Sequence, residues 1–169
     1  MIVHQMVKTM RDGNAVTRWH TRRMLSRDSV GEHTANVLAI VFALCPNRQP
    51  SLALVGATLL HDTAEQWTGD IPATAKWSSP ELKQASEELE AKKLTENWLD
   101  VPKITDEEAL ILKWADMLEL CYRCLDELNL GNRTAYEVFD RGVAYLRSLP
   151  SLPAGEALLT EVMKDRNYV

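Results

Sequence analysis

The sequence has few cysteines, few glycines and no excess of basic residues, and each shortage excludes a class of protein. Three cysteines are an odd number without a disulfide framework, so we expect a protein of the reducing cytoplasm. Seven glycines and seven prolines leave no low-complexity stretch. The longest apolar run is far shorter than a membrane span, and residues 1–10 lack the features of a signal peptide. The net charge of −5 argues against a general nucleic-acid binder.

Apolar side chains with helical spacing fill most of the chain, and no stretch alternates as a strand would. The 169 residues, 46% of them apolar, fit one domain with a single core, spanning residues 1–169. We therefore predict a single all-α domain, a bundle of six or seven helices. The expected helices cover residues 1–12, 32–45, 51–65, 80–99, 106–129, 133–148 and 154–164, and residues 15–30 and 68–72 are expected to be irregular.

The helices expected at 51–65 and 106–129 are apolar nearly all round, which predicts that both are buried at the centre of the bundle. Ionisable side chains in such helices are costly unless they are paired or bind a metal. His61 and Asp62 nevertheless lie toward the end of the first helix, and Asp116 lies in the middle of the second. His33 lies near the start of the helix 32–45. Three helices thus bring nitrogen or oxygen donors inward.

Two imidazoles and two carboxylates suit divalent metals such as Mn, Fe, Co, Ni, Zn or Mg. No thiolate belongs to the set, which argues against a closed structural zinc site. His61 and Asp62 are adjacent, so both reach one metal only at a helix end or a bend. Glu65, four residues after His61, is placed to orient or deprotonate a metal-bound water if the helix continues. Taken singly, His33 also fits a core or capping histidine, and Asp116 a hydrogen-bonded buried carboxylate.

Several other residues have a structural explanation beside a functional one. Cys121 and Cys124 form a CxxC inside a helix without a second pair, so we expect both to fill the core. Trp67 and Trp77 flank the 68–72 loop, and we expect them to be packing residues. A basic cluster between Arg18 and Arg27 fits either a pocket for a small anion such as a nucleotide or a solvated surface.

Five short segments together resemble one protein family. They are Arg18-Trp19, Val30 to His33, Leu60 to Glu65, Thr68 to Lys76, and Lys113 to Asp116. The order of His33, His61-Asp62 and Asp116 resembles the H…HD…D pattern of HD-domain phosphohydrolases. The local sequences resemble the YfbR-like branch, the bacterial 5′-deoxynucleotidases. The segment from Arg18 to Thr21 is similar to phage-encoded dATP triphosphohydrolases, which would place the protein in a host cytoplasm.

This resemblance implies an HD-domain bundle with a divalent metal cofactor, be it Co, Mn, Mg, Zn or Ni. The implied metal ligands are His33, His61, Asp62 and Asp116. Two further acids have implied catalytic roles. Glu65 would activate or position the attacking water, and Asp70 would bind the sugar 3′-hydroxyl or protonate the leaving oxygen. Asp70 also fits a simple cap of the turn after Gly69.

The resemblance also implies residues that bind the substrate. Arg18 and Lys76 would hold phosphate oxygens, Arg18 as a planar fork and Lys76 as a point charge. Lys113, one helical turn before Asp116, would reach the same phosphates. Trp19 would pack against the deoxyribose or the base. The alternatives are that Lys76 and Lys113 are surface lysines and that Trp19 belongs to the core.

Three functions remain open at this point. The cation count and the phage-like segment favour a dNTP triphosphohydrolase, dATP being the first candidate, that releases the deoxynucleoside and triphosphate. A 5′-deoxynucleotidase acting on dNMPs is the second. A nucleotide-binding module without turnover is the third, and the presence of Glu65 with all four ligands argues against it. We expect a small-molecule deoxynucleotide as the partner, neither nucleic acid nor membrane, and a homo-oligomer.

Overall fold

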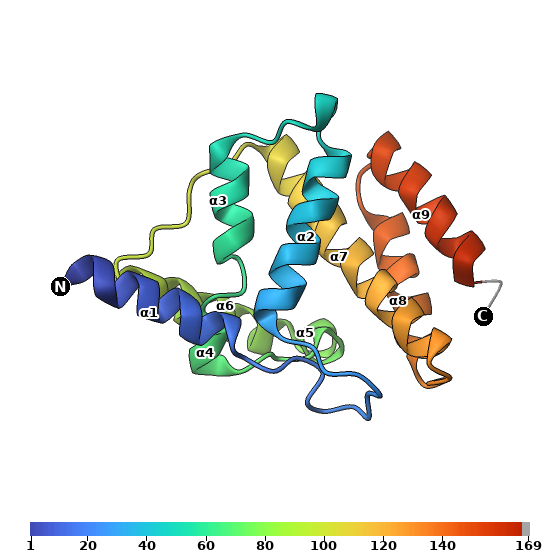
Figure 1. The fold of residues 1–169 in the computed structure, drawn as a ribbon, viewed down its shortest axis with the longest axis horizontal. Helices are drawn as coiled ribbons and strands as arrows, with labels where there is room; N and C mark the ends of the chain where they lie inside the picture. Colours follow the sequence, from blue (N-terminus) through green and yellow to red (C-terminus); the bar gives the residue numbers. More distant parts are fainter. Residues whose placement is uncertain (167–169) are drawn as a thin grey trace.

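The computed structural model describes residues 1–166, and within that range the protein consists of helices without a strand (Figure 1). The helices are α1 (Ile2–Asn14), α2 (Val30–Leu44), the 3₁₀ turn η1 (Pro46–Arg48), α3 (Leu52–Leu60), α4 (Glu65–Thr68), α5 (Ala73–Ser78), α6 (Pro80–Glu96), α7 (Asp106–Asn129), α8 (Ala135–Ser148) and α9 (Pro153–Arg166). The all-α prediction is confirmed, and each of the expected helices is present. Across the described range, every helix is too short or too polar to cross a membrane.

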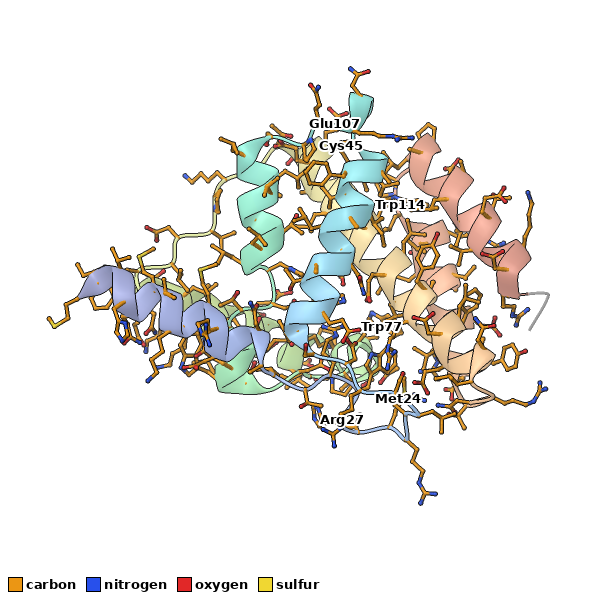
Figure 2. All side chains as sticks on the ribbon, in the orientation of Figure 1. Met24, Arg27, Cys45, Trp77, Glu107 and Trp114 are labelled. Carbon is orange, nitrogen blue, oxygen red and sulfur yellow. The ribbon has the colours of Figure 1, made fainter. Side chains whose placement is uncertain are left out.

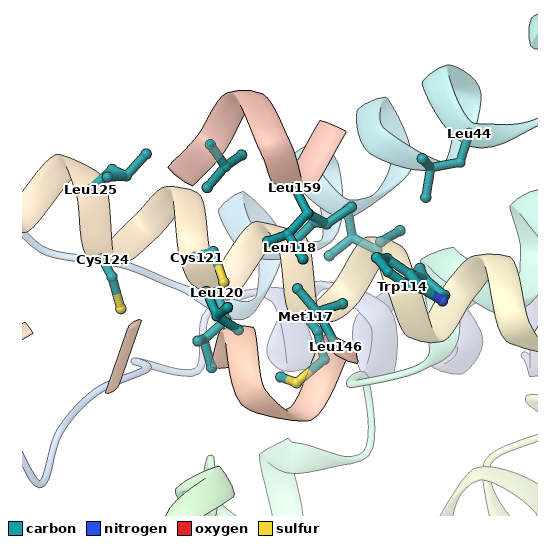
Figure 3. Close-up of a cluster of buried hydrophobic side chains, with 14 of the residues drawn as sticks. Leu44, Trp114, Met117, Leu118, Leu120, Cys121, Cys124, Leu125, Leu146 and Leu159 are labelled. Carbon is teal, nitrogen blue, oxygen red and sulfur yellow. The ribbon is translucent and has the colours of Figure 1, made fainter. Parts of the chain in front are cut away.

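The long helix α7 is the centre of the bundle, with α2, α3, α8 and α9 packed around it. Figure 3 shows its apolar side chains meeting Leu44 of α2, Leu146 of α8 and Leu159 of α9. Cys121 and Cys124 are fully buried free thiols within this core, as expected from their helical setting. A second, smaller apolar cluster joins α3 to α6 through Leu60 and Leu94. The main core therefore leaves only the end of α3 and the start of α2 free to build a site beside α7.

Hydroxyl side chains begin four of these helices, where they accept otherwise unpaired backbone N–H groups. Ser29, Ser51 and Ser79 each accept from the backbone N–H three residues later. Thr105 and Glu108 form a complete capping box at the start of α7. The starts predicted at Ser79-Pro80 and Thr105 are therefore confirmed.

The helix predicted at 51–65 is wrong in its end, because α3 stops at Leu60 and the chain turns before α4 begins at Glu65. Side chains compete for the helical carbonyls here. The Nδ1 of His61 donates to the Thr58 carbonyl at 2.6 Å, and the Thr63 hydroxyl donates to that of Leu59. The predicted loop at 68–72 is confirmed, but a further short helix, α5, follows it. The turn at 61–64 is what allows adjacent side chains to face one point.

Residues 15–29 are irregular, as expected, and one buried carboxylate holds the middle of this segment. Glu127 of α7 is fully buried and accepts the backbone N–H groups of Leu25 and Ser26 at 2.8 and 2.9 Å. It also accepts from the Ser26 hydroxyl and the Asn132 amide, both at 2.7 Å. Burial alone would raise the pKa of Glu127, but these hydrogen bonds lower it from 4.5 to about 2. The ionised form of Glu127 therefore stabilises the fold.

We expect Glu127→Gln to lower the free energy of unfolding by about 3 kcal/mol at pH 7, because the amide loses the charge and one acceptor. The pKa of Glu127 is lower in the folded state, so its contribution is present above pH 4.5 and is lost as the pH falls toward 2. The difference between variant and wild type should therefore shrink below pH 4.5. Urea denaturation at several pH values measures this.

Asp126→Asn is the matched control, since Asp126 lies next to Glu127 on the same helix but is exposed. It should change the stability by less than about 0.5 kcal/mol. Equal losses in the two variants, or a Glu127→Gln loss independent of pH, would contradict the role given to Glu127.

Candidate metal centre

Four side chains from three parts of the chain converge beside the middle of α7. His33 comes from the first turn of α2, His61 and Asp62 from the turn after α3, and Asp116 from α7. The Nε2 of His33 lies 3.3 Å from the Nε2 of His61 and 3.4 Å from both Asp62 Oδ2 and Asp116 Oδ1. The Nε2 of His61 lies 3.3 Å from Asp62 Oδ2. The side chains singled out in the sequence are thus gathered around one point.

Each imidazole makes a hydrogen bond through Nδ1, on the side away from this point. These bonds determine whether Nε2 faces the point with a lone pair or with an N–H group. A carbonyl oxygen can only accept, so His61 must donate from Nδ1 to Thr58. His33 donates from Nδ1 to the carboxylate of Glu119 at 2.6 Å. In the neutral form each ring therefore turns the lone pair of Nε2 toward the centre. Two imidazole nitrogens and two carboxylates, turned inward in this way, fit a divalent cation.

The charges at this centre are strongly coupled to one another. Burial alone would raise the pKa values of Asp62 and Asp116, but both histidines lower them, together with Arg18 beside Asp62 and Lys113 beside Asp116. Burial lowers the pKa of His33, yet hydrogen bonds to Asp116 and Glu119 raise it to about 10. His33 thus helps to compensate the charge of the carboxylates around it. A divalent cation would take over that compensation.

Arg18 is the cation of the irregular segment that reaches the centre. Its Nη1 donates to Asp62 Oδ2 at 2.9 Å, and its Nε lies 3.6 Å from Asp28 Oδ2. Burial alone would lower the pKa of the guanidinium, but the carboxylates of Asp62, Asp70 and Glu65 raise it. The side chain is therefore a fixed positive charge at the edge of the centre. Its place agrees with the expectation that it faces a phosphate.

Glu65 begins α4 and is nearly buried. Its Oε2 has no hydrogen-bond partner among the described residues. Burial, together with the negative charges of Asp62 and Asp70, raises the pKa of its carboxyl to about 9. A buried carboxyl with a free oxygen and a high affinity for protons is suited to proton transfer.

A pocket next to the centre is lined by two tryptophans. Trp19, Trp77, Asp70 and Pro72 contribute to its wall, and Arg18 connects it to the metal centre. The backbone N–H of Trp19 donates to Asp70 Oδ2 at 3.0 Å, and Trp19 has the uncommon φ of 59°. Asp70 thus accepts a hydrogen bond from the backbone of Trp19 and helps to hold it in this conformation. Backbone strain of this kind persists where the surrounding structure holds it in place.

The two lysines proposed for phosphate lie at different distances from the centre. The Nζ of Lys113 is 3.3 Å from Asp116 Oδ2 and 5.5 Å from the ring centre of Tyr145. Lys76 of α5 is half-buried. Burial raises the pKa values of Glu65 and Glu90, and the positive charge of Lys76 offsets part of that rise. Lys113 thus contacts the centre directly, whereas Lys76 acts on it through its charge.

Sequence reasoning missed two residues of this site. Trp77 was expected to be a packing residue, but it lines the pocket and its ring stacks on Tyr145 of α8 at a centroid distance of 6.0 Å. Figure 2 shows Trp77 at the end of α5, on the side toward α8. Glu119, which orients His33, was not noticed. Its position one helical turn after Asp116 was a usable signal, whereas no local pattern distinguishes Trp77 from a core tryptophan.

Proteins similar to this chain include bacterial 5′-deoxynucleotidases. The family model described as 5′-deoxynucleotidase YfbR-like matches residues 5–165. A 5′-deoxynucleotidase of Photobacterium profundum is 30% identical over 142 residues, which cover 70% of this chain and 72% of that protein. A 5′-deoxynucleotidase of Photorhabdus laumondii is 31% identical over 140 residues, 69% of this chain and 70% of the relative.

Solved structures show the same fold at low sequence identity. An HD-domain phosphohydrolase of Listeria innocua has a TM-score of 0.75 at 22% identity, covering 96% of this chain and 88% of the other. The HD phosphohydrolase DatZ of cyanophage S-2L, in a structure with dA and one catalytic Zn²⁺ ion, has a TM-score of 0.72 at 19% identity, covering 96% of both chains.

These matches confirm the predicted all-α HD-domain fold and the predicted hydrolase class. The family match and the cluster of His33, His61 and Asp62 together support the predicted divalent metal cofactor. The match extends over nearly the whole chain, beyond the short segments that carried the resemblance. The chain has the fold of HD-domain phosphohydrolases and belongs to the YfbR-like 5′-deoxynucleotidase family.

Proposed function

We propose that the protein hydrolyses the phosphate ester of 2′-deoxynucleotides at a divalent metal ion bound by His33, His61, Asp62 and Asp116. The observation that supports this most is the convergence of the four side chains, whose neighbouring donor atoms lie 3.3 to 3.4 Å apart. In this proposal the bound cation lowers the pKa of a water and neutralises charge on a phosphoryl oxygen. The remaining steps belong to side chains around it.

Glu65 takes the proton of the attacking water in this proposal. Its unpartnered oxygen is free to accept the proton in the ionised form, which a bound cation would favour by lowering the pKa of this carboxyl. Arg18 and Lys113 hold phosphoryl oxygens, since both already contact a proposed ligand, Asp62 or Asp116. Lys76 adds positive charge at longer range. These cations stabilise the negative charge of the phosphate as the bond to the leaving oxygen breaks.

The pocket beside the centre receives the nucleoside in this proposal. Trp19 and Trp77 offer apolar ring surface to the sugar and the base, and Asp70 offers a carboxylate oxygen. Asp70 holds the backbone of Trp19 and therefore also fixes the wall against which the sugar packs. A hydrogen bond from the sugar 3′-hydroxyl to Asp70, or protonation of the leaving oxygen by it, completes the assignment.

Two substrates compete, and they differ in the phosphate product: the deoxynucleoside leaves in both cases, with phosphate formed from a dNMP and triphosphate from a dNTP. The sequence alone favoured a triphosphate, but the family and the relatives are named for 5′-deoxynucleotidase activity, which favours a dNMP. We therefore propose a dNMP as the first candidate. A dNTP such as dATP is the second, favoured by the fold shared with DatZ and by Arg22, a further cation on the pocket wall.

The substrate is tested by incubating the protein with each dNMP and each dNTP in the presence of Mn²⁺, Co²⁺, Zn²⁺ or Mg²⁺. Anion-exchange chromatography separates phosphate, triphosphate and the deoxynucleoside. We expect a deoxynucleoside and phosphate from at least one dNMP. Release of triphosphate would favour the second candidate. Turnover of neither class, with any of the four metals, would contradict the proposed function.

We expect His61→Ala and Asp62→Ala each to reduce hydrolysis to the background rate, because each removes a proposed metal ligand. The helical circular dichroism signal should persist, since neither side chain belongs to the apolar core. His4→Ala and Asp100→Ala are matched controls at exposed positions and should retain full activity. Full activity of either ligand variant after removal of metal would contradict the assignment.

We expect Glu65→Gln to lower kcat by about 100- to 10,000-fold while leaving metal affinity nearly unchanged, because the amide cannot take the proton of water. Steady-state kinetics and a metal titration measure the two effects separately. Glu81→Gln, at an exposed position of α6, is the control and should leave both values unchanged. A loss of metal affinity as large as the loss of kcat would identify Glu65 as a ligand instead.

A further inference from the structure

Glu119 is a carboxylate inside the bundle that the proposed reaction does not use. Only 3% of its surface is exposed, and the ring of His33, which it faces, is completely buried. Its Oε2 lies 2.6 Å from His33 Nδ1, the shortest contact of that imidazole. Burying a carboxylate is costly unless strong hydrogen bonds compensate it. The bond to His33 is thus the interaction that makes this position of Glu119 tolerable.

Among the described residues, no side chain other than His33 forms a hydrogen bond with the Glu119 carboxylate. Arg123, one turn further along α7, lies instead near Asp28 and Glu127. A carboxylate that served only to balance the neighbouring arginines would be expected to contact one of them. Glu119 contacts an imidazole whose other nitrogen faces the metal centre.

The two histidines of the centre are oriented by different groups. His61 donates to the backbone carbonyl of Thr58, which is neutral and lies in the helix just before it. His33 donates to a charged side chain from another helix. A carboxylate behind a metal-bound imidazole fixes its tautomer and ring orientation and increases its donor strength. A single helix, α7, thus supplies Asp116 to the centre and holds His33 with Glu119.

We propose that Glu119 is a positioning residue that fixes the tautomer of His33 and strengthens the binding of a divalent cation by that imidazole. This inference rests on the proposed function, because it requires that His33 binds a metal. Removal of the acceptor would leave His33 Nδ1–H buried without a partner, or would free the ring to present Nε2–H to the cation. Either arrangement weakens metal binding before any substrate is present.

The test measures the Kd of Mn²⁺ and Zn²⁺ for the metal-free protein by isothermal titration calorimetry. Glu119→Leu removes the acceptor and should raise the Kd about 10- to 100-fold. Glu119→Gln keeps an acceptor for Nδ1–H but removes the charge, so its Kd should lie between those of the leucine variant and the wild type. Glu107→Gln, an exposed carboxylate near the start of the same helix, is the control and should bind as the wild type does.

A second measurement separates positioning from simple support of the fold. In the Zn²⁺-loaded wild type we expect a protected Nδ1–H proton of His33, shifted strongly downfield in the ¹H NMR spectrum by its bond to Glu119. This signal should move upfield in Glu119→Gln and disappear in Glu119→Leu. The proton on the Nδ1 of His61 should not move. Thermal unfolding of the metal-free variants shows whether each of them is folded.

The outcomes distinguish this inference from the proposed function. Failure of the wild type to bind any of the metals would contradict the proposed function itself. A wild type that binds metal, with both Glu119 variants folded and within twofold of its Kd, would overturn the inference alone. If Glu119→Leu does not fold, Glu119→Gln decides: an unchanged Kd and an unmoved His33 proton overturn the inference, and changes in both support it.

Discussion

The compensation of buried negative charge between α2, α3 and α7 is the constraint on which the rest of the structure depends. Glu119 is buried, and Asp62 and Asp116 are partly buried, with 20% and 25% of their side chains exposed; carboxylates withdrawn from water in this way need partners. His33 provides a hydrogen-bond donor toward Glu119 and a second nitrogen toward the other two. Without a cation, the hydrogen bonds of His33 and the guanidinium of Arg18 compensate these carboxylates. A divalent cation would complete the same set of partners. The charged groups that must be compensated in the fold are therefore the same groups that would bind the proposed metal.

The irregular segment before α2 depends on a second set of buried charges, which fixes the place of Arg18. Glu127 accepts the backbone N–H groups of Leu25 and Ser26, and thereby replaces the hydrogen bonds that a helix or sheet would supply. Asp28 then lies between the guanidinium groups of Arg18 and Arg123. A loop anchored in this way holds the guanidinium of Arg18 beside Asp62.

The pocket for the nucleoside is built where the chain is least regular. Trp19 is held at positive φ by Asp70, and Trp77 lies in the short helix α5, which follows the loop after α4. Loops positioned by a rigid scaffold are where substrate contacts are commonly found. The family to which the chain belongs fixes the reaction class, whereas the identity of the base and the number of phosphates depend on these loop contacts. Relatives with the same centre can therefore differ in substrate without a change of fold.

The sequence by itself determined the helices and the candidate ligands, because both leave a local pattern. Apolar spacing and hydroxyl caps mark the helices, and His33, His61, Asp62 and Asp116 stand out as ionisable groups in apolar segments. Only the tertiary structure decided that α3 ends at Leu60. The apolar pattern alone would extend the helix, but His61 and Thr63 form side-chain hydrogen bonds to carbonyls of its last turn. The tertiary structure alone gave Glu119, Glu127 and Trp77 their roles. The position of Glu119 one turn after Asp116 is a local signal, but a tryptophan beside a loop has none, and the function of each residue depends on the partner that folding brings to it from a distant part of the chain.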